Sequence, residues 1–367
     1  MLDNVKITER QFIVLVILYI IGSAILVIPS ILVSLAKQDS WITAILTVGV
    51  ALSIMSLYVL LGRRFPNMTL IEYTEEILGV WLGKTVSLLF LTFPVVAASL
   101  TLYNIGDFMK TQIMPETPIE AIYILAFGIT LMGVRLGLEV LARSGEILFP
   151  LVIFLFLLLV VFITPELKFE NLQPVFEEGI KPVLTAGIHF LSFPFLDTVI
   201  FLMIFPYVNW TQKAGKSLYR AILLGGIFLS VIIFLSILVL GVDQTARQIY
   251  STYFLAKKIN VGDFVTRIEA IVAGIWFIST FFKMSMLFYV LNLGIAQILN
   301  LKDYRFLTLP LGMILLVFSL VSVPNTAYLG EYTLKTGYIF TATFGLLLPL
   351  LLLAVDTLRK KLSVREC

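Results

Sequence analysis

One lysine lies inside a long apolar segment of the chain, where an ionised side chain requires a partner. Lys283 falls within the run from Ile271 to Leu291, and Asp197 occurs in a second apolar segment. An ionisable group at membrane depth is costly unless it meets a counter-charge or water, so each is a candidate functional residue. With a rise of about 1.5 Å per helical residue, both side chains are expected near the middle of their segments and close in depth to Gly22.

Two interpretations of Lys283 remain open. In the first, Lys283 and Asp197 form a permanent structural ion pair. In the second, the ammonium binds backbone carbonyls around Gly22 to Ala24 in place of a coupling cation, and it can carry a proton. Asp197 follows Pro194 by three residues, where the positive end of a new helix favours a carboxylate.

Helix-breaking residues occur in two of the apolar segments. The first segment contains Gly22-Ser23-Ala24 and then Pro29, and the sixth contains Ser192-Phe193-Pro194. Paired interruptions in the first and sixth of ten helices are a sequence pointer to a transporter site near the bilayer midplane. Unwinding frees backbone groups that a polar ligand can bind. The alternative is that small residues only let helices pack closely.

A ligand site at these breaks is expected to combine small residues with polar and aromatic ones. Residues of the third and eighth segments complete it, since Ser285 and Tyr289 share one helical face at i,i+4 spacing. The candidate ligand-binding residues are Gly22, Ser23, Ala24, Ala97, Thr101, Ser192, Phe193, Ser285 and Tyr289.

Other ionisable residues carry weaker predictions. Arg143 and Glu146 are three residues apart, a spacing typical of a local salt bridge, and they are a possible inner gate. His189 is the single histidine and has no second ligand beside it, so a hydrogen-bonded interior role is favoured over metal binding. We predict no cofactor and no metal.

The composition indicates one membrane domain over residues 1–367. Hydrophobic residues make up 59% and charged residues 13%, with a mean hydropathy of +1.02. The net charge of +3 is small and argues against nucleic-acid binding. No phosphate-binding loop, HExxH sequence or nucleophile elbow occurs, so an enzyme is not expected.

About ten transmembrane helices are predicted, in an all-α polytopic fold. Sixteen of the 26 Lys and Arg residues fall on the side of the termini and nine on the other, with Lys283 inside a span. The positive-inside rule then places both termini in the cytoplasm. The predicted spans are 11–34, 41–61, 84–109, 118–135, 143–163, 182–207, 217–241, 264–298, 306–323 and 334–356.

Two connections are expected to hold short helices. Residues 68–78 alternate apolar residues with Glu72, Glu75 and Glu76, which predicts an amphipathic helix on the inner surface. Residues 242–263 mix aromatic and basic side chains, and we interpret Tyr250 and Tyr253 as interfacial anchors.

Several short sequences resemble the spore germination permeases. They are Phe65-Pro66-Asn67, Leu70 to Tyr73, Gly79 to Lys84, Glu139 to Pro150, and Glu170 to Pro174. These permeases are the B subunits of germinant receptors, within the amino acid–polyamine–organocation superfamily.

The resemblance covers essentially the whole chain. It implies a five-plus-five inverted repeat with broken helices one and six, and halves near 8–163 and 180–356. It further implies recognition of a small germinant such as an amino acid, and assembly with A and C subunits in the spore inner membrane. A proton-coupled amino acid symporter and a passive scaffold remain as alternatives, because sensing and flux both require a pocket and moving helices.

Overall fold

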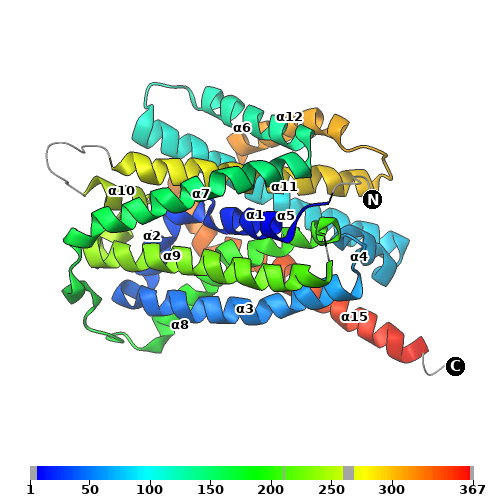
Figure 1. Cartoon of the computed structure of the whole chain (residues 1–367), viewed down its shortest axis with the longest axis horizontal. Helices are drawn as coiled ribbons and strands as arrows, with labels where there is room; N and C mark the ends of the chain where they lie inside the picture. The colour runs from blue at the N-terminus through cyan, green and yellow to red at the C-terminus, as the bar shows by residue number, and fades with distance from the viewer. Residues whose placement is uncertain (1–5, 210, 259–267, 364–367) are drawn as a thin grey trace.

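The computed structural model describes residues 6–209, 211–258 and 268–363, and within these ranges the chain is a bundle of helices (Figure 1). The β pairing described there is a single isolated bridge between Ile7 and Val208. The predicted all-α fold is confirmed. The α-helices are α1 Glu9–Ile21, α2 Ala24–Ala36, α3 Ser40–Arg64, α4 Leu70–Leu78, α5 Val80–Phe108, α6 Ile119–Leu136, α7 Leu138–Ile163, α8 Ile180–Phe190, α9 Thr211–Arg247, α10 Ser251–Lys257, α11 Glu269–Ile298, α12 Thr308–Ser322, α13 Thr326–Tyr332, α14 Tyr338–Ala342 and α15 Leu348–Ser363.

The described helices make ten membrane crossings. Nine helical segments in these ranges are long and apolar enough to span a bilayer, and the first of them, 24–64, contains α2 and the whole of α3. α1 has 13 residues and completes the first crossing together with α2. α13, α14 and α15 follow one another through π-helical turns at Thr333–Gly337 and Thr343–Leu347 and form the tenth crossing.

Some predicted boundaries are wrong. The fifth span begins at Leu138 rather than near 143, because Gly137, with φ of 96°, ends α6 and starts α7 in one step. The seventh runs to Arg247 with a break at Gly241, where φ is 71°. The start of the predicted eighth span, at 264, lies outside the described residues, and α11 begins at Glu269.

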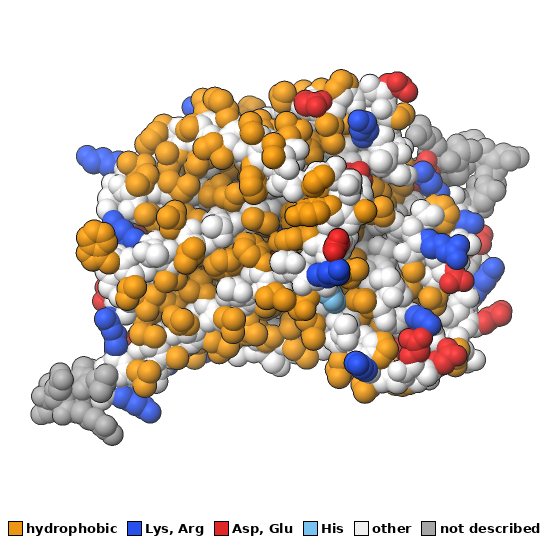
Figure 2. All heavy atoms as spheres, turned by 180° about the vertical axis from the view of Figure 1, so that it is seen from behind, with side chains coloured by type: hydrophobic (Ala, Val, Ile, Leu, Met, Phe, Trp, Pro, Cys, Tyr) orange, Lys and Arg blue, Asp and Glu red, His pale blue; other side chains and the backbone are white. Residues whose placement is uncertain are grey.

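The crossings differ strongly in burial. Each crossing was compared by the buried share of its own most apolar stretch. That share is 78% in the sixth crossing (180–203), 72% in α11 and 17% in α7. Crossing six and α11 are therefore surrounded by other helices, whereas α7 faces lipid over most of its length. Figure 2 shows hydrophobic side chains across the middle of one face, with charged side chains mainly toward the two ends. The chain is a multi-pass membrane protein.

The N-terminal end of α1 and the C-terminal end of α15 lie at the same end of the bundle (Figure 1). This end is called the terminal end below, and the other is called the distal end. An even number of crossings requires this arrangement. Assignment of the terminal end to the cytoplasm remains a prediction from the charge distribution.

The first predicted short helix is present as α4. Thr69 caps it: its hydroxyl accepts from the Glu72 N–H, and the Glu72 carboxylate accepts from the Thr69 N–H. Leu70, Tyr73 and Ile77 are buried. The alternation of apolar and acidic residues therefore marks the buried and open faces of this helix.

The second predicted short helix is present as α10, but the anchoring role of Tyr250, just before α10, and of Tyr253 is wrong. Tyr250 and Tyr253 are 7% and 5% exposed and pack edge-on against Phe108. Tyr250 donates its hydroxyl to Asp107 at 2.5 Å. Burial and the Asp107 carboxylate raise the pKa of Tyr250, so its phenol keeps the proton it donates. Residues 259–263 lie outside the described ranges.

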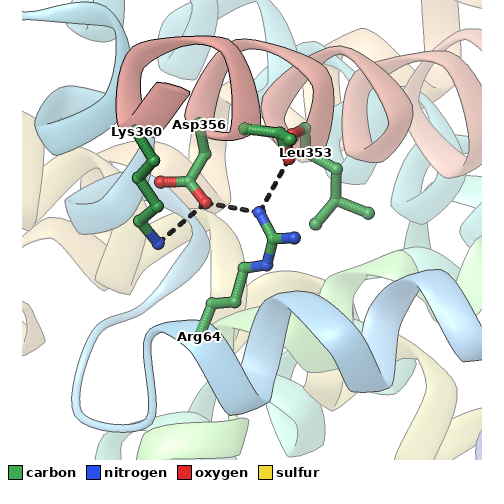
Figure 3. A network of polar contacts seen from close by, with 5 residues as sticks. Arg64, Leu353, Asp356 and Lys360 are labelled. Carbon is green, nitrogen blue, oxygen red and sulfur yellow. Dashed lines mark hydrogen bonds and ion pairs between the residues drawn. The ribbon is translucent and has the colours of Figure 1, made fainter. Parts of the chain in front are cut away.

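At the terminal end, one carboxylate joins the second crossing to the last. Arg64 of α3 donates to Asp356 at 2.5 Å and to Thr357 at 3.1 Å, and Lys360 donates to Asp356 at 3.1 Å (Figure 3). The Asp356 side chain is 9% exposed. Removing the Asp356 carboxylate would leave the Arg64 guanidinium without its charged acceptor, at a contact between α3 and α15 that is partly shielded from water.

We expect Asp356→Ala to lower the free energy of unfolding by about 1–3 kcal/mol, because hydrogen bonds to a charged group are lost. Glu331→Ala is the matched control, since Glu331 pairs with Lys335 at 2.8 Å on the same crossing but is 62% exposed. Thermal unfolding in detergent measures both. Equal shifts for the two variants would contradict a stabilising role for the Asp356 network.

Candidate functional site

The first crossing is interrupted where the sequence placed a break. α1 ends at Ile21 and α2 begins at Ala24, and the Gly22 N–H closes α1 on the Leu18 carbonyl at 2.9 Å. A β-carbon on Gly22 would lie 2.7 Å from Lys283 Cδ and 2.8 Å from the Tyr19 carbonyl oxygen. Residue 22 therefore has to be glycine for the lysine stem to pass this close.

The sixth crossing changes helix type at the predicted position. α8 ends at Phe190, Phe193 has the non-helical angles φ −122° and ψ 111°, and a 3-10 helix covers Leu196–Met203. Asp197 stands in the first turn of that 3-10 helix. The carboxylate is thus held near the start of a helix, where the helix dipole favours a negative charge.

Lys283 and Asp197 meet between these two interruptions. Lys283 Nζ lies 3.1 Å from Asp197 Oδ2, and the side chains are 2% and 6% exposed. The ammonium also lies 4.2 Å from the centre of the Phe193 ring and 5.1 Å from that of Tyr19. Rings that face a cation add electrostatic stabilisation to the pair.

This geometry bears on both interpretations of Lys283. The counter-charge required by the structural interpretation is present. In the second interpretation, the Lys283 ammonium binds the backbone carbonyls around Gly22. In the structure, the Ser279 hydroxyl donates to the Gly22 carbonyl oxygen at 3.4 Å. The role of the pair in ligand response remains a prediction.

A cavity of about 410 Å³ lies against the pair. Its walls come from α2, α5, the sixth crossing and the α13–α14 region, and it reaches Ile249, just before α10, and Thr326, at the start of α13. On the other side of the pair, Phe12 packs on Phe201, and so does Tyr19, with ring centres 5.7 and 5.3 Å apart. The cavity therefore extends from mid-bundle toward the distal end and is closed toward the terminal end.

The cavity brings together most, but not all, of the predicted ligand residues. Gly22 and Ala24 are not in its lining, although they adjoin Ser23, which is. The predicted residues that line it are Ser23, Ala97, Thr101, Ser192, Phe193, Asp197 and Lys283.

Ser285 and Tyr289 lie elsewhere. Ser285 is two residues beyond Lys283, about 200° around the helix, and is fully buried among neighbouring helices. Tyr289 packs on Tyr304, with ring centres 5.3 Å apart. Ser285 and Tyr289 lie on one face of α11, as their i,i+4 spacing requires, but this face does not line the cavity.

Sequence reasoning missed several lining residues. His189 is 8% exposed, lines the cavity, and has an Nδ1 atom without a hydrogen-bond partner in the described chain. Asn104 on α5 and a group of polar and aromatic side chains on the tenth crossing also line it. The latter group is Thr326, Tyr332, Thr333, Tyr338, Phe340 and Thr341. Such a polar composition is unusual for a helix that only faces lipid, and this was the available signal.

The predicted local salt bridge between Arg143 and Glu146 is wrong. Arg143 pairs with Glu139, one turn earlier on α7. Glu146 instead accepts from Arg10 and from Gln11, both at 3.2 Å, and so joins α7 to the start of α1. An inner-gate role for Glu146 and Arg143 remains a prediction.

We expect Gly22→Ala to weaken ligand binding at this site by at least about tenfold, because the methyl group displaces Lys283 or the Tyr19 carbonyl. Gly49→Ala is the control, since a β-carbon there meets no atom within 4 Å. Equilibrium binding to protein in nanodiscs measures the effect. Unchanged affinity in the Gly22 variant would remove the first interruption from the site.

Comparison with known proteins identifies the family of this chain. The spore germination protein family profile matches residues 6–327. The chain is 29% identical to spore germination protein KB of Bacillus subtilis (strain 168) over 98% of this chain and 97% of that protein. It is 25% identical to spore germination protein YndE of the same organism, with coverage of 97% and 98%.

Solved structures share the fold at low sequence identity. The crystal structure of MhsT in complex with L-phenylalanine superposes with a TM-score of 0.63 at 15% identity, covering 97% of this chain and 99% of that one. A Na⁺-coupled sialic acid symporter in a substrate-bound outward-open state gives 0.61 at 12% identity, with coverage of 91% and 78%. These likenesses confirm the predicted five-plus-five inverted-repeat fold class. The family match over nearly the whole chain shows that this protein belongs to the spore germination permeases.

Proposed function

We propose that this chain is a receptor subunit of permease-like architecture that recognises a small germinant, an amino acid, at the mid-bundle cavity. The observation that carries the proposal is the cavity of about 410 Å³ that ends on the Lys283–Asp197 pair between two helix interruptions. Its volume exceeds that of a single amino acid, its walls are mostly apolar, and its two charged side chains lie together at one end, as in small-molecule sites.

Relatives and fold support this assignment in different ways. The matched proteins are named for spore germination, which supports a role in that process. MhsT was solved in complex with L-phenylalanine, which supports an amino acid as the ligand class for this fold. The chain is then a binding protein rather than an enzyme, since recognition alone triggers the response.

Assembly is part of the same proposal. The B subunits that this chain resembles act with A and C subunits in the spore inner membrane. Many apolar side chains on α6, α7 and α12 are exposed, and such faces suit contact with lipid or with a partner helix. We propose that the chain works as the B subunit of such a receptor, with both termini in the cytoplasm.

A proton-coupled amino acid symporter is the second candidate. The likeness to a Na⁺-coupled symporter favours it, because the same fold performs concentrative uptake there. A buried lysine beside a carboxylate offers a proton-binding group that could serve as the coupling site.

Binding and uptake by the purified full chain in proteoliposomes separate the candidates. For the receptor we expect saturable binding of labelled L-phenylalanine or L-alanine without accumulation under an imposed proton gradient. Gradient-driven accumulation would establish the symporter instead. Absence of binding and uptake across all twenty amino acids would contradict both.

Assembly is tested by affinity purification of the chain from spore membranes in mild detergent. We expect the A and C subunits to co-purify, because the resemblance implies a three-subunit receptor. The Gly49→Ala variant, with a change that meets no atom within 4 Å, serves as the control for tagging and extraction. Recovery of the free chain alone, with all three subunits expressed, would contradict the assembly.

A further inference from the structure

The charges around the cavity are few and balanced. Among the described lining residues, Asp197 and Lys283 are the two with full charges, and they lie 3.1 Å apart. The nearest charged residues of the tenth crossing, Glu331 and Lys335, pair with each other and are more than 60% exposed. At the distal end of α5, Asp107 accepts from Tyr250 and Thr326. The cavity thus has no surplus charge at its closed end.

The rest of the lining is predominantly apolar. Phe93, Val96 and Leu100 come from α5, and Phe340 comes from the tenth crossing. These side chains offer a contact surface for an apolar body and offer no counter-charge. Among the described lining residues, the full charges that can neutralise a ligand's charged groups are those of Asp197 and Lys283 at the closed end.

A buried ion pair acts as a local dipole. A ligand with a single charge strengthens its contact with one partner but repels the other, and its net charge stays uncompensated in surroundings of low polarity. A zwitterion avoids this, because its ammonium can approach Asp197 while its carboxylate approaches Lys283. The geometry therefore discriminates between ligands by net charge.

We propose that the Asp197–Lys283 pair is the charge filter of the cavity and selects zwitterionic amino acids with an apolar side chain. This inference rests on the proposed function and assigns its ligand class. It gives the pair a role in recognition that differs from structural neutralisation and from replacement of a coupling cation. Both partners border the cavity, although their side chains are only 2% and 6% exposed.

Three probes with the same apolar body test the filter on the full chain in nanodiscs. They are L-phenylalanine, which is zwitterionic, 2-phenylethylammonium, a cation, and 3-phenylpropionate, an anion. The parent chain is expected to bind phenylalanine at least about tenfold more tightly than either other probe. Lys283→Met, which leaves the carboxylate unopposed, should shift preference toward the cation by at least about tenfold, and Asp197→Asn should shift it equally toward the anion.

The matched control is Glu331→Gln, which changes an exposed charge outside the lining and should leave the parent ranking unchanged. A parent ranking retained in both single variants would overturn the filter while leaving the proposed function intact. Failure of the parent chain to bind phenylalanine or any other zwitterionic amino acid would instead overturn the proposed function.

A double variant keeps the test decisive if a single variant does not fold. Lys283→Met with Asp197→Asn leaves no unpaired buried charge, so it should fold. The parent is expected to prefer zwitterionic phenylalanine over uncharged 3-phenylpropanamide, and the double variant should lose that preference. Retention of the preference in the double variant would overturn the filter.

Discussion

A lysine in the middle of a membrane bundle needs a counter-charge within hydrogen-bond reach, and this requirement organises the centre of the protein. Lys283 reaches Asp197 at 3.1 Å only because α11 passes directly over Gly22, where any side chain would collide with the lysine stem. The pair therefore fixes α11, the first crossing and the sixth crossing relative to one another. Among the nine long apolar segments, the two with the largest buried share, the sixth crossing and α11, are the two that carry it.

The pair also divides the bundle into two unlike halves. Toward the terminal end, Phe12, Tyr19 and Phe201 fill the space with edge-on ring contacts. Toward the distal end, the cavity stays open beside Ser23 and Ser192, and Asp107 joins α5 to α10 and α13 near its mouth. The cavity thus approaches the pair from the distal end, while aromatic packing fills the terminal side of the pair.

The sequence predicted features that a residue type determines by itself. Lys283 in an apolar run, Asp197 after a proline and the glycine break at Gly22 each require a particular environment, and the structure provides it. It did not predict the rotation of a helix about its own axis, because many faces of a membrane helix are equally apolar. Ser285 and Tyr289 were therefore placed in the site although their face of α11 does not line the cavity. For the same reason, the tenth crossing was not predicted to line the cavity.

A lysine ammonium differs from a bound metal ion in one respect that matters for signalling. It is covalently attached and cannot leave with the ligand, so ligand binding and any proton transfer supply the free energy for a conformational change at this site. A ligand shifts the equilibrium between two helix arrangements only by the difference in its affinity for them. The contacts that differ most readily are those at Gly22 and Phe193, where the backbone leaves helical geometry beside the ion pair. A zwitterion held by Lys283 and Asp197 would lie beside both interruptions, so a backbone change at either one would alter its affinity and supply the difference that a sensor requires.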